Sequence, residues 1–427
     1  MQRYVTPLDE RISFTSHVDA IQQAVDIASQ TGVNAVLIPR FTPDGKTVWD
    51  IDKAIKLPSD MTVYLDNCHL RLADGSFTNV FVNSNYKTDI GDTLEGEQRN
   101  INIIGIGNNL IDGGNYNGLS ERTSNKDGFP SIQENVTILF HNVRDFKVTG
   151  IKIKHQRWWA MLFKYCRFGQ ITDIYFNADL AYRNENGNRC TDRLPLNRSE
   201  VWIKNADGVD LRQGCNNILI ENISGNTEDD TIALTNLYQS KAGGNHVEGK
   251  DTDIHDVVIK NIRSDAYTCS NVRLLSDKNT YVYNIIIDGV VDNTTEDCPY
   301  RAGAAVKISD SDFQKHGNAT VDNMKNISIN NIFSRANYGV KMLMASSNIS
   351  INNVFMKNPK GYAVAHDNGY VYPDNSGPFG YKNVNISNVY YQKDPEIEFP
   401  VNFDNCTAEN FSVNVNPEIK VNIKNPK

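Results

Sequence analysis

The sequence lacks an excess of positive charge and any grouping of its cysteines. It has 43 lysines and arginines against 51 aspartates and glutamates, which gives a net charge of −8. A nucleic-acid-binding protein needs a basic face that displaces phosphate counterions, so we expect no nucleic-acid partner. The seven cysteines show neither CxxC spacing nor a disulfide framework, and we interpret them as mostly buried thiols.

The sequence also lacks a long apolar run and a signal peptide. A helix that crosses a bilayer needs about 20 apolar residues, and no run approaches this length. The first residues also lack the charged start and apolar stretch of a signal peptide. We therefore expect no membrane partner and a cytoplasmic location, or a secreted or periplasmic one if a precursor was trimmed. No His/Cys cluster has metal-ligand spacing, so no metal or other cofactor is expected. The oligomeric state is left open.

One amphipathic helix is predicted near the N terminus, before a series of short strands. Ser16 fits an N-cap, with Asp19 three residues on, and Gly32 marks the end of the helix. The expected apolar face consists of Val18, Ile21, Val25 and Ala28. Such a helix would cover strand edges at the open end of a solenoid. Residues 1–60 are predicted to form this cap and the first strands.

From about residue 100 the chain repeats one pattern: an Asn or Asp turn, a run such as I-x-I, a polar corner and a second short run. It recurs at 99–114, 144–155, 168–177, 216–224, 254–263, 281–291, 324–336, 347–358 and 381–393. Strand-rich repeats about 20 to 50 residues apart favour a parallel β-helix. A sandwich or a propeller is the alternative, but Asn at corners tolerates left-handed backbone and can form ladders between turns. Residues 61–427 are expected to form one continuous body.

Four carboxylates lie on two neighbouring runs of this pattern. Asp207 and Asp210 flank the first run, and Asp229 and Asp230 open the second. Residues one solenoid turn apart would stack about 4.8 Å apart, which would gather the acids into one patch. When acids lie close together, the pKa of at least one of them is raised. Glycoside hydrolysis needs this difference, because one carboxylic acid donates a proton while another carboxylate activates water.

Alternation along the strands predicts a cationic strip beside these acids. Side chains of a strand point alternately inward and outward, and the outward positions on what would be successive coils are those of Asp210, Arg212, Arg273, Lys307 and Lys341. A cationic strip in an acidic protein suits an anionic substrate such as a uronate-containing glycan. The structural alternative is that such outward charges are simply solvated.

The motifs resemble those of the polygalacturonase family, the pectin-cleaving glycoside hydrolases. NADG at 205–208 is similar to that family's N-T-D-G motif, and EDDTIAL at 228–234 to its D-D-C-I-A-I motif. The resemblance implies a right-handed parallel β-helix, and an inverting hydrolase with Asp229 as general acid and Asp207 and Asp230 holding the attacking water. Cys269 stands near the place of the family's G-H-G histidine, and the R-I-K strand is matched only by Arg273 or Lys307.

Three tryptophans are further candidate site residues, and two functions other than glycoside hydrolysis are also considered. Trp158, Trp159 and Trp202 are candidates for walls of a sugar site, although Trp159 and Phe163 fit the core better. A polysaccharide lyase on the same scaffold is a second reading, in which a basic residue such as Arg273 removes the proton beside the uronate carboxyl and calcium, with the four aspartates, neutralises that carboxyl. A non-catalytic glycan-binding β-helix, as in tailspikes or adhesins, is the third reading.

Overall fold

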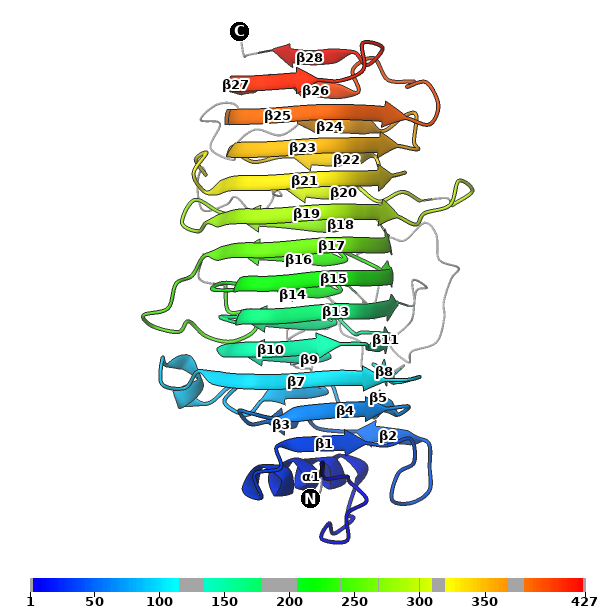
Figure 1. The fold of residues 1–427 in the computed structure, drawn as a ribbon, viewed down its shortest axis with the longest axis vertical. Coiled ribbons are helices and arrows are strands. Elements are labelled where there is room, and N and C mark those ends of the chain that lie inside the picture. Colours follow the sequence, from blue (N-terminus) through cyan, green and yellow to red (C-terminus); the bar gives the residue numbers. More distant parts are fainter. Residues whose placement is uncertain are drawn as a thin grey trace. The chain divides into compact units, whose positions relative to one another are not determined.

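The structure is a computed structural model. It describes residues 3–114, 134–178, 206–238, 240–267, 269–298, 300–308, 319–366 and 380–424. Most of them lie in parallel strands stacked on one another, with a single α-helix at the N-terminal end of this part of the chain (Figure 1). These parallel sheets, matched below by similar solved structures, confirm the predicted all-β, right-handed parallel β-helix.

Contacts between Cα atoms divide the chain into two compact units. Unit 1 consists of Met1–Asp210 and Lys241–Asp251, and unit 2 of Leu211–Ser240 and Thr252–Lys427. The expected division at residue 60 stays a prediction. In the part of the chain that the structure describes, no helix has the length and apolar character that a membrane crossing requires.

Unit 1 begins with the predicted helix, α1 (His17–Gln30). Ser16 is its N-cap and accepts a hydrogen bond from the backbone N–H of Asp19 at 3.2 Å. All four residues of the expected apolar face are buried, and the helix packs against the first three strands. The prediction of a helical cap is therefore confirmed.

The strands of unit 1 pair in parallel along three rows. The first row is β1 (Ala35–Ile38), β4 (Thr62–Asp66), β7 (Gln98–Ile106), β10 (Val143–Thr149) and β13 (Arg167–Asn177). The second row is β2 (Val48–Ile51), β5 (His69–Leu72), β8 (Leu110–Asp112) and β11 (Lys152–Lys154). The third row is β3 (Ile55–Leu57), β6 (Phe81–Asn83), β9 (Ile138–His141) and β12 (Met161–Lys164). A short 3₁₀-helix, η1 (Asp89–Asp92), follows β6, and β14 (Val209–Leu211) spans the boundary of the units in sequence.

Unit 2 has two rows of parallel strands. The long strands are β15 (Asn216–Thr227), β17 (Ile254–Ala266), β19 (Val282–Asp292), β21 (Met324–Ser334), β23 (Ser346–Met356), β25 (Gly380–Tyr391) and β27 (Thr407–Asn414). The short strands are β16 (Ile232–Asn236), β18 (Ser270–Ser276), β20 (Ala304–Ile308), β22 (Tyr338–Met342), β24 (Tyr362–His366), β26 (Val401–Asp404) and β28 (Val421–Lys424). Isoleucines in register on six long strands fill the core: Ile220, Ile259, Ile287, Ile329, Ile351 and Ile386.

Asparagine ladders fix the corners of unit 2, as the repeats predicted. Asn284, Asn326 and Asn348 have φ of 56°, 57° and 55°. The side-chain amide of Asn326 donates to Oδ1 of Asn284 at 3.0 Å, and that of Asn348 donates to Oδ1 of Asn326 at 2.9 Å. Asn383 and Asn410 continue the ladder. Each rung satisfies an amide at a left-handed corner, which holds successive coils in register.

Candidate active site

Two of the predicted acids, Asp229 and Asp230, lie at the entrance to β16 in unit 2. Asp229 is partly exposed, whereas Asp230 is 1% exposed. The backbone N–H of Ser270 donates to Oδ1 of Asp230 at 2.8 Å, and Nε of Arg273 lies 3.0 Å from Oδ2. Strand β18 supplies both contacts, because Ser270 begins it and Arg273 is its fourth residue. The neighbouring coil therefore fixes the orientation of the Asp230 carboxyl.

The protonation of this pair is set by burial and by opposing charges. Burial raises the pKa of Asp230 above its usual range; Arg273 opposes this shift and the negative charge of Asp229 adds to it. Two acids this close titrate together, so the raised pKa belongs to the pair. Asp230 has a donor or a cation at each oxygen, whereas Asp229 reaches solvent. The pair can therefore retain a proton that Asp229 presents to a bound molecule.

A buried polar network supports the backbone beside Asp229. The hydroxyl of Thr227 donates to the carbonyl oxygen of Asp229 at 2.9 Å. The hydroxyl of Thr231 donates to Oγ of Ser264 at 2.8 Å, and the amide of Asn271 donates to the same Oγ at 2.8 Å. This network was not predicted from the sequence. Its only signal was that small polar residues flank both strand entrances, TEDDTI and SNVRL.

The predicted cationic strip is in register on three successive strands of unit 2. Arg273 on β18 pairs with Lys307 on β20, which pairs with Lys341 on β22. Neighbouring strands are about 4.8 Å apart, so the strip runs along the stack at that spacing. Nζ of Lys341 lies 4.6 Å from the ring centre of Tyr338, a cation–π contact. Lys307 thus lies beside Arg273 on the next coil, so the arginine and the lysine are neighbours although they do not share one R-I-K strand.

Asp207 and Asp210, the other predicted acids, belong to unit 1. The backbone N–H of Ala160 donates to the carbonyl oxygen of Asp207 at 2.9 Å, which continues the parallel pairing of β12. Asp207 is 3% exposed and Asp210 is fully buried. The expectation that Asp210 and Arg212 lie on the outer surface is wrong, since Arg212 in unit 2 is also buried, with 5% exposure.

A covering loop in unit 1 shows why an outward position need not be exposed. The segment 241–251 packs over the outer face of β9 and β12. A Cβ on Gly243 would lie 2.1 Å from a methyl carbon of Leu162 and would displace it, and the φ of +80° also favours glycine here. Nζ of Lys164 donates to the carbonyl oxygen of Gly244 at 2.8 Å. Alternation sets the direction of a side chain, but covering loops set its exposure.

Two histidines near these motifs in sequence, His246 and His255, each contact a neighbouring side chain. Nδ1 of His246 lies 2.6 Å from the hydroxyl of Tyr165 in unit 1. His255 in unit 2 lies 2.7 Å from a carboxylate oxygen of Asp256 and stacks on Tyr283 at an interplanar angle of 3°.

Cys269 lies beside the acid pair of unit 2. Its Sγ and one carboxylate oxygen each of Asp229 and Asp230 lie within 4.8 Å of one another. These three atoms are potential metal ligands, although Arg273 already neutralises Asp230 at 3.0 Å. The thiol thus takes a place next to the pair at which the resemblance implied a histidine.

Of the predicted aromatic walls, two can be placed in unit 1. Trp158 is buried, with its ring centre 5.7 Å from that of Trp159. Trp159 is partly buried and packs against a cluster that includes Leu139 and Leu162. Phe163 is fully buried, as preferred from the sequence. Trp202 lies outside the described residues.

The described residues form a parallel β-helix with two carboxylates, Asp229 and Asp230, at the entrance of β16. Residues 51–249 match the model of the family "Glycosyl hydrolases family 28", and this stretch contains all four predicted acids. The match confirms both the resemblance to polygalacturonase-type enzymes and the prediction of a glycoside hydrolase. No protein of curated function matches the chain in sequence.

Solved structures share the fold at low sequence identity. A family 28 exopolygalacturonase from Yersinia enterocolitica has a TM-score of 0.50 and 12% identity, over 99% of this chain and 80% of that one. The surface adhesin PfbA of Streptococcus pneumoniae has a TM-score of 0.52 and 13% identity, over 96% and 93%. An endo-xylogalacturonan hydrolase from Aspergillus tubingensis has a TM-score of 0.48 and 13% identity, over 98% and 95%.

Proposed function

We propose that the chain hydrolyses glycosidic bonds in a uronate-containing glycan of the pectic type, with inversion at the anomeric carbon. One observation carries this proposal: the Asp229 and Asp230 pair, fixed by β18, stands in the same unit as the in-register column of Arg273, Lys307 and Lys341. Paired carboxyls cleave a glycosidic bond, and the lysines of the column bind the negative charges of the substrate.

Each acid has a separate role in this mechanism. Asp229, which reaches solvent, donates its proton to the leaving glycosidic oxygen. Asp230 enters the reaction ionised because Ser270 N–H and Arg273 stabilise its charge, and it becomes neutral when it takes the proton of the attacking water. In the single displacement that results, water attacks the face opposite the leaving group.

The cations divide between positioning and binding. Arg273 contacts Asp230 at 3.0 Å and the hydroxyl of Thr235 at 3.3 Å, so we assign it to holding the base in place. Lys307 and Lys341 are partly exposed and follow it on the next two coils. They are suited to bind carboxylates of successive uronate residues, with Lys341 positioned by Tyr338.

The test is a screen of neutral and uronate oligosaccharides, with products identified by NMR and ultraviolet absorbance. We expect cleavage of uronate substrates without an unsaturated product. Lys307→Ala should raise KM about tenfold with little change in kcat. Added salt should reduce the difference in KM between this variant and the wild type. Lys360→Ala is the matched control, because that side chain is 75% exposed outside the column. An unsaturated product would indicate a lyase, and intact glycan a non-catalytic binding protein.

A further inference from the structure

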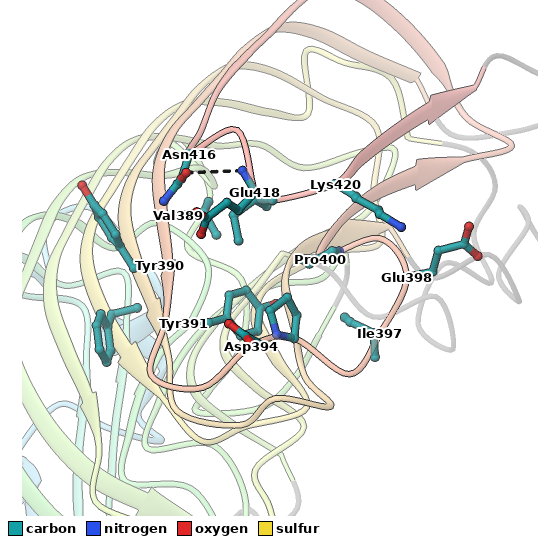
Figure 2. A pocket seen from close by; sticks show the side chains of 13 residues that line it. Val389, Tyr390, Tyr391, Asp394, Ile397, Glu398, Pro400, Asn416, Glu418 and Lys420 are labelled. Atoms are coloured by element: carbon teal, nitrogen blue, oxygen red, sulfur yellow. Dashed lines mark hydrogen bonds between the residues drawn. The ribbon is translucent and has the colours of Figure 1, made fainter.

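A cavity of about 500 Å³ lies in unit 2, away from the short strands that carry the acid pair. Two corner loops, 392–400 and 415–420, border it together with the ends of β23 and β25. Figure 2 shows Tyr390 at one end of the cavity and Glu398 and Lys420 at the other. Its volume lies within the range of about 300 to 1,000 Å³ typical of small-ligand sites.

A column of aromatic side chains leads into this cavity. Phe333 on β21, Phe355 on β23 and Tyr390 on β25 are in register. Phe333 is 41% and Tyr390 45% exposed, and the rings of Phe333 and Phe355 lie 5.7 Å apart. Phe355 and Tyr390 also line the cavity. Aromatic rings exposed on successive strands form an apolar surface of the kind that marks a binding site.

The polar lining of the cavity is acidic. Asp394, Glu398 and Glu418 line it against the single cation Lys420. Ionised carboxylates accept hydrogen bonds and repel anions, so they suit a ligand with many hydroxyl groups and no negative charge. The hydroxyl of Tyr391 donates to the carbonyl oxygen of Gly361 at 2.8 Å, which fixes this ring as part of the wall.

We propose that this cavity and the aromatic column form a second carbohydrate site, specific for a neutral oligosaccharide. The apolar face of a sugar ring would lie on Tyr390 and Phe355, while its hydroxyls donate to Asp394 and Glu418. The charge of the lining is opposite to that of the Arg273, Lys307 and Lys341 column, so the two sites select different sugars. The ligand is either a separate neutral polysaccharide or a neutral branch on the uronate glycan.

Affinity electrophoresis in native gels tests the proposal with the full chain. The gels contain galactan, arabinan or xylan as free neutral polysaccharides, galactan-bearing rhamnogalacturonan as the branched source, or polygalacturonate. We expect retardation by a neutral or a branched glycan, unchanged by salt because no ion pair is involved. Tyr390→Ala should weaken that binding about tenfold while leaving hydrolysis unaltered. Tyr175→Ala is the matched control, since Tyr175 in unit 1 is also 45% exposed.

The outcomes separate this site from the catalytic proposal. Retardation by free galactan identifies a separate polysaccharide, and retardation only by the branched glycan identifies a side branch. Equal retardation of the two tyrosine variants, binding of polygalacturonate alone, or no retardation by any glycan overturns the proposal. So does a fall in sedimentation mass on Tyr390→Ala, which would make the surface a protein interface. Retardation that persists in a chain without hydrolytic activity would overturn only the catalytic assignment.

Discussion

Replacement of Arg273 by methionine should destabilise the chain in a pH-dependent manner. Arg273 is the cation that lies 3.0 Å from the Asp230 carboxylate, and their side chains are 12% and 1% exposed. Methionine fills similar space but removes the charge, so the ionised Asp230 would face the negative charge of Asp229 with the Ser270 N–H and the charge of Lys307 but without its contacting cation. The substitution therefore removes one partner of a buried ion pair.

The expected cost is about 3 to 5 kcal/mol of unfolding free energy at pH 7. The pKa of Asp230 is already raised by burial, and loss of Arg273 raises it further. Below this raised pKa the folded chain takes up a proton at Asp230, so the uncompensated charge disappears and the cost of the substitution shrinks. The destabilisation should therefore be larger at pH 7 than at pH 4.5.

Urea unfolding followed by tryptophan fluorescence measures this cost as a shift in midpoint at constant slope. The double variant Arg273→Met with Asp230→Asn should recover part of the loss, because no charge remains to be compensated. Lys307→Met, a partly exposed member of the same column, should cost less than about 1 kcal/mol. An equal cost at both pH values, or no recovery in the double variant, would refute the reasoning.

Three further perturbations test the fold and the site. Asn348→Ala should cost about 1 to 3 kcal/mol of unfolding free energy, because it removes ladder hydrogen bonds at a φ of 55°; a cost under 0.5 kcal/mol in urea unfolding would contradict this. Burial lowers the pKa of His141 to about 4, so stability should be lost as pH falls from about 6.5 toward 4, by up to about 3 kcal/mol. His141→Gln should weaken this pH dependence of stability. If the urea midpoint of the variant changes with pH as it does in the wild type, the role of His141 is contradicted. Asn271→Ala removes the amide that donates to Ser264 and should lower kcat about tenfold or more with KM nearly unchanged; steady-state kinetics that show only a higher KM would disprove this positioning role.

The repeats predicted most of the fold because their physics is local. Period-two alternation identified runs that became β7, β15, β19 and β23, and asparagines at the corners predicted the ladder through Asn348. The helix 17–30 followed from its N-cap and its apolar spacing. These features depend on residues close in sequence or exactly one coil apart, so a single sequence is enough to find them.

The site was predicted only in part because exposure and pairing depend on segments without periodicity. The strip of Arg273, Lys307 and Lys341 followed from alternation, and the structure places the three in register. Burial of Asp210 did not follow, since alternation gives the direction of a side chain and not its exposure. On β12, for example, Leu162 is covered by Gly243, which is distant in sequence. The contact of Arg273 with Asp230 was missed for another reason: Arg273 pairs with Ala233 across the coils, so its side chain reaches an acid three residues away from the position opposite it.

The most direct test of the proposed mechanism is the configuration of the first-formed product, followed by proton NMR during cleavage of a uronate oligosaccharide. The wild-type chain should release the inverted anomer first. Asp229→Asn should release product at least about a hundredfold more slowly, since a general acid contributes roughly 10² to 10⁴ to the rate. Asp322→Asn is the control, because that carboxylate is 68% exposed and pairs only with Lys325 among the ion pairs described. A retained anomer, or undiminished turnover by Asp229→Asn, would contradict the assignment.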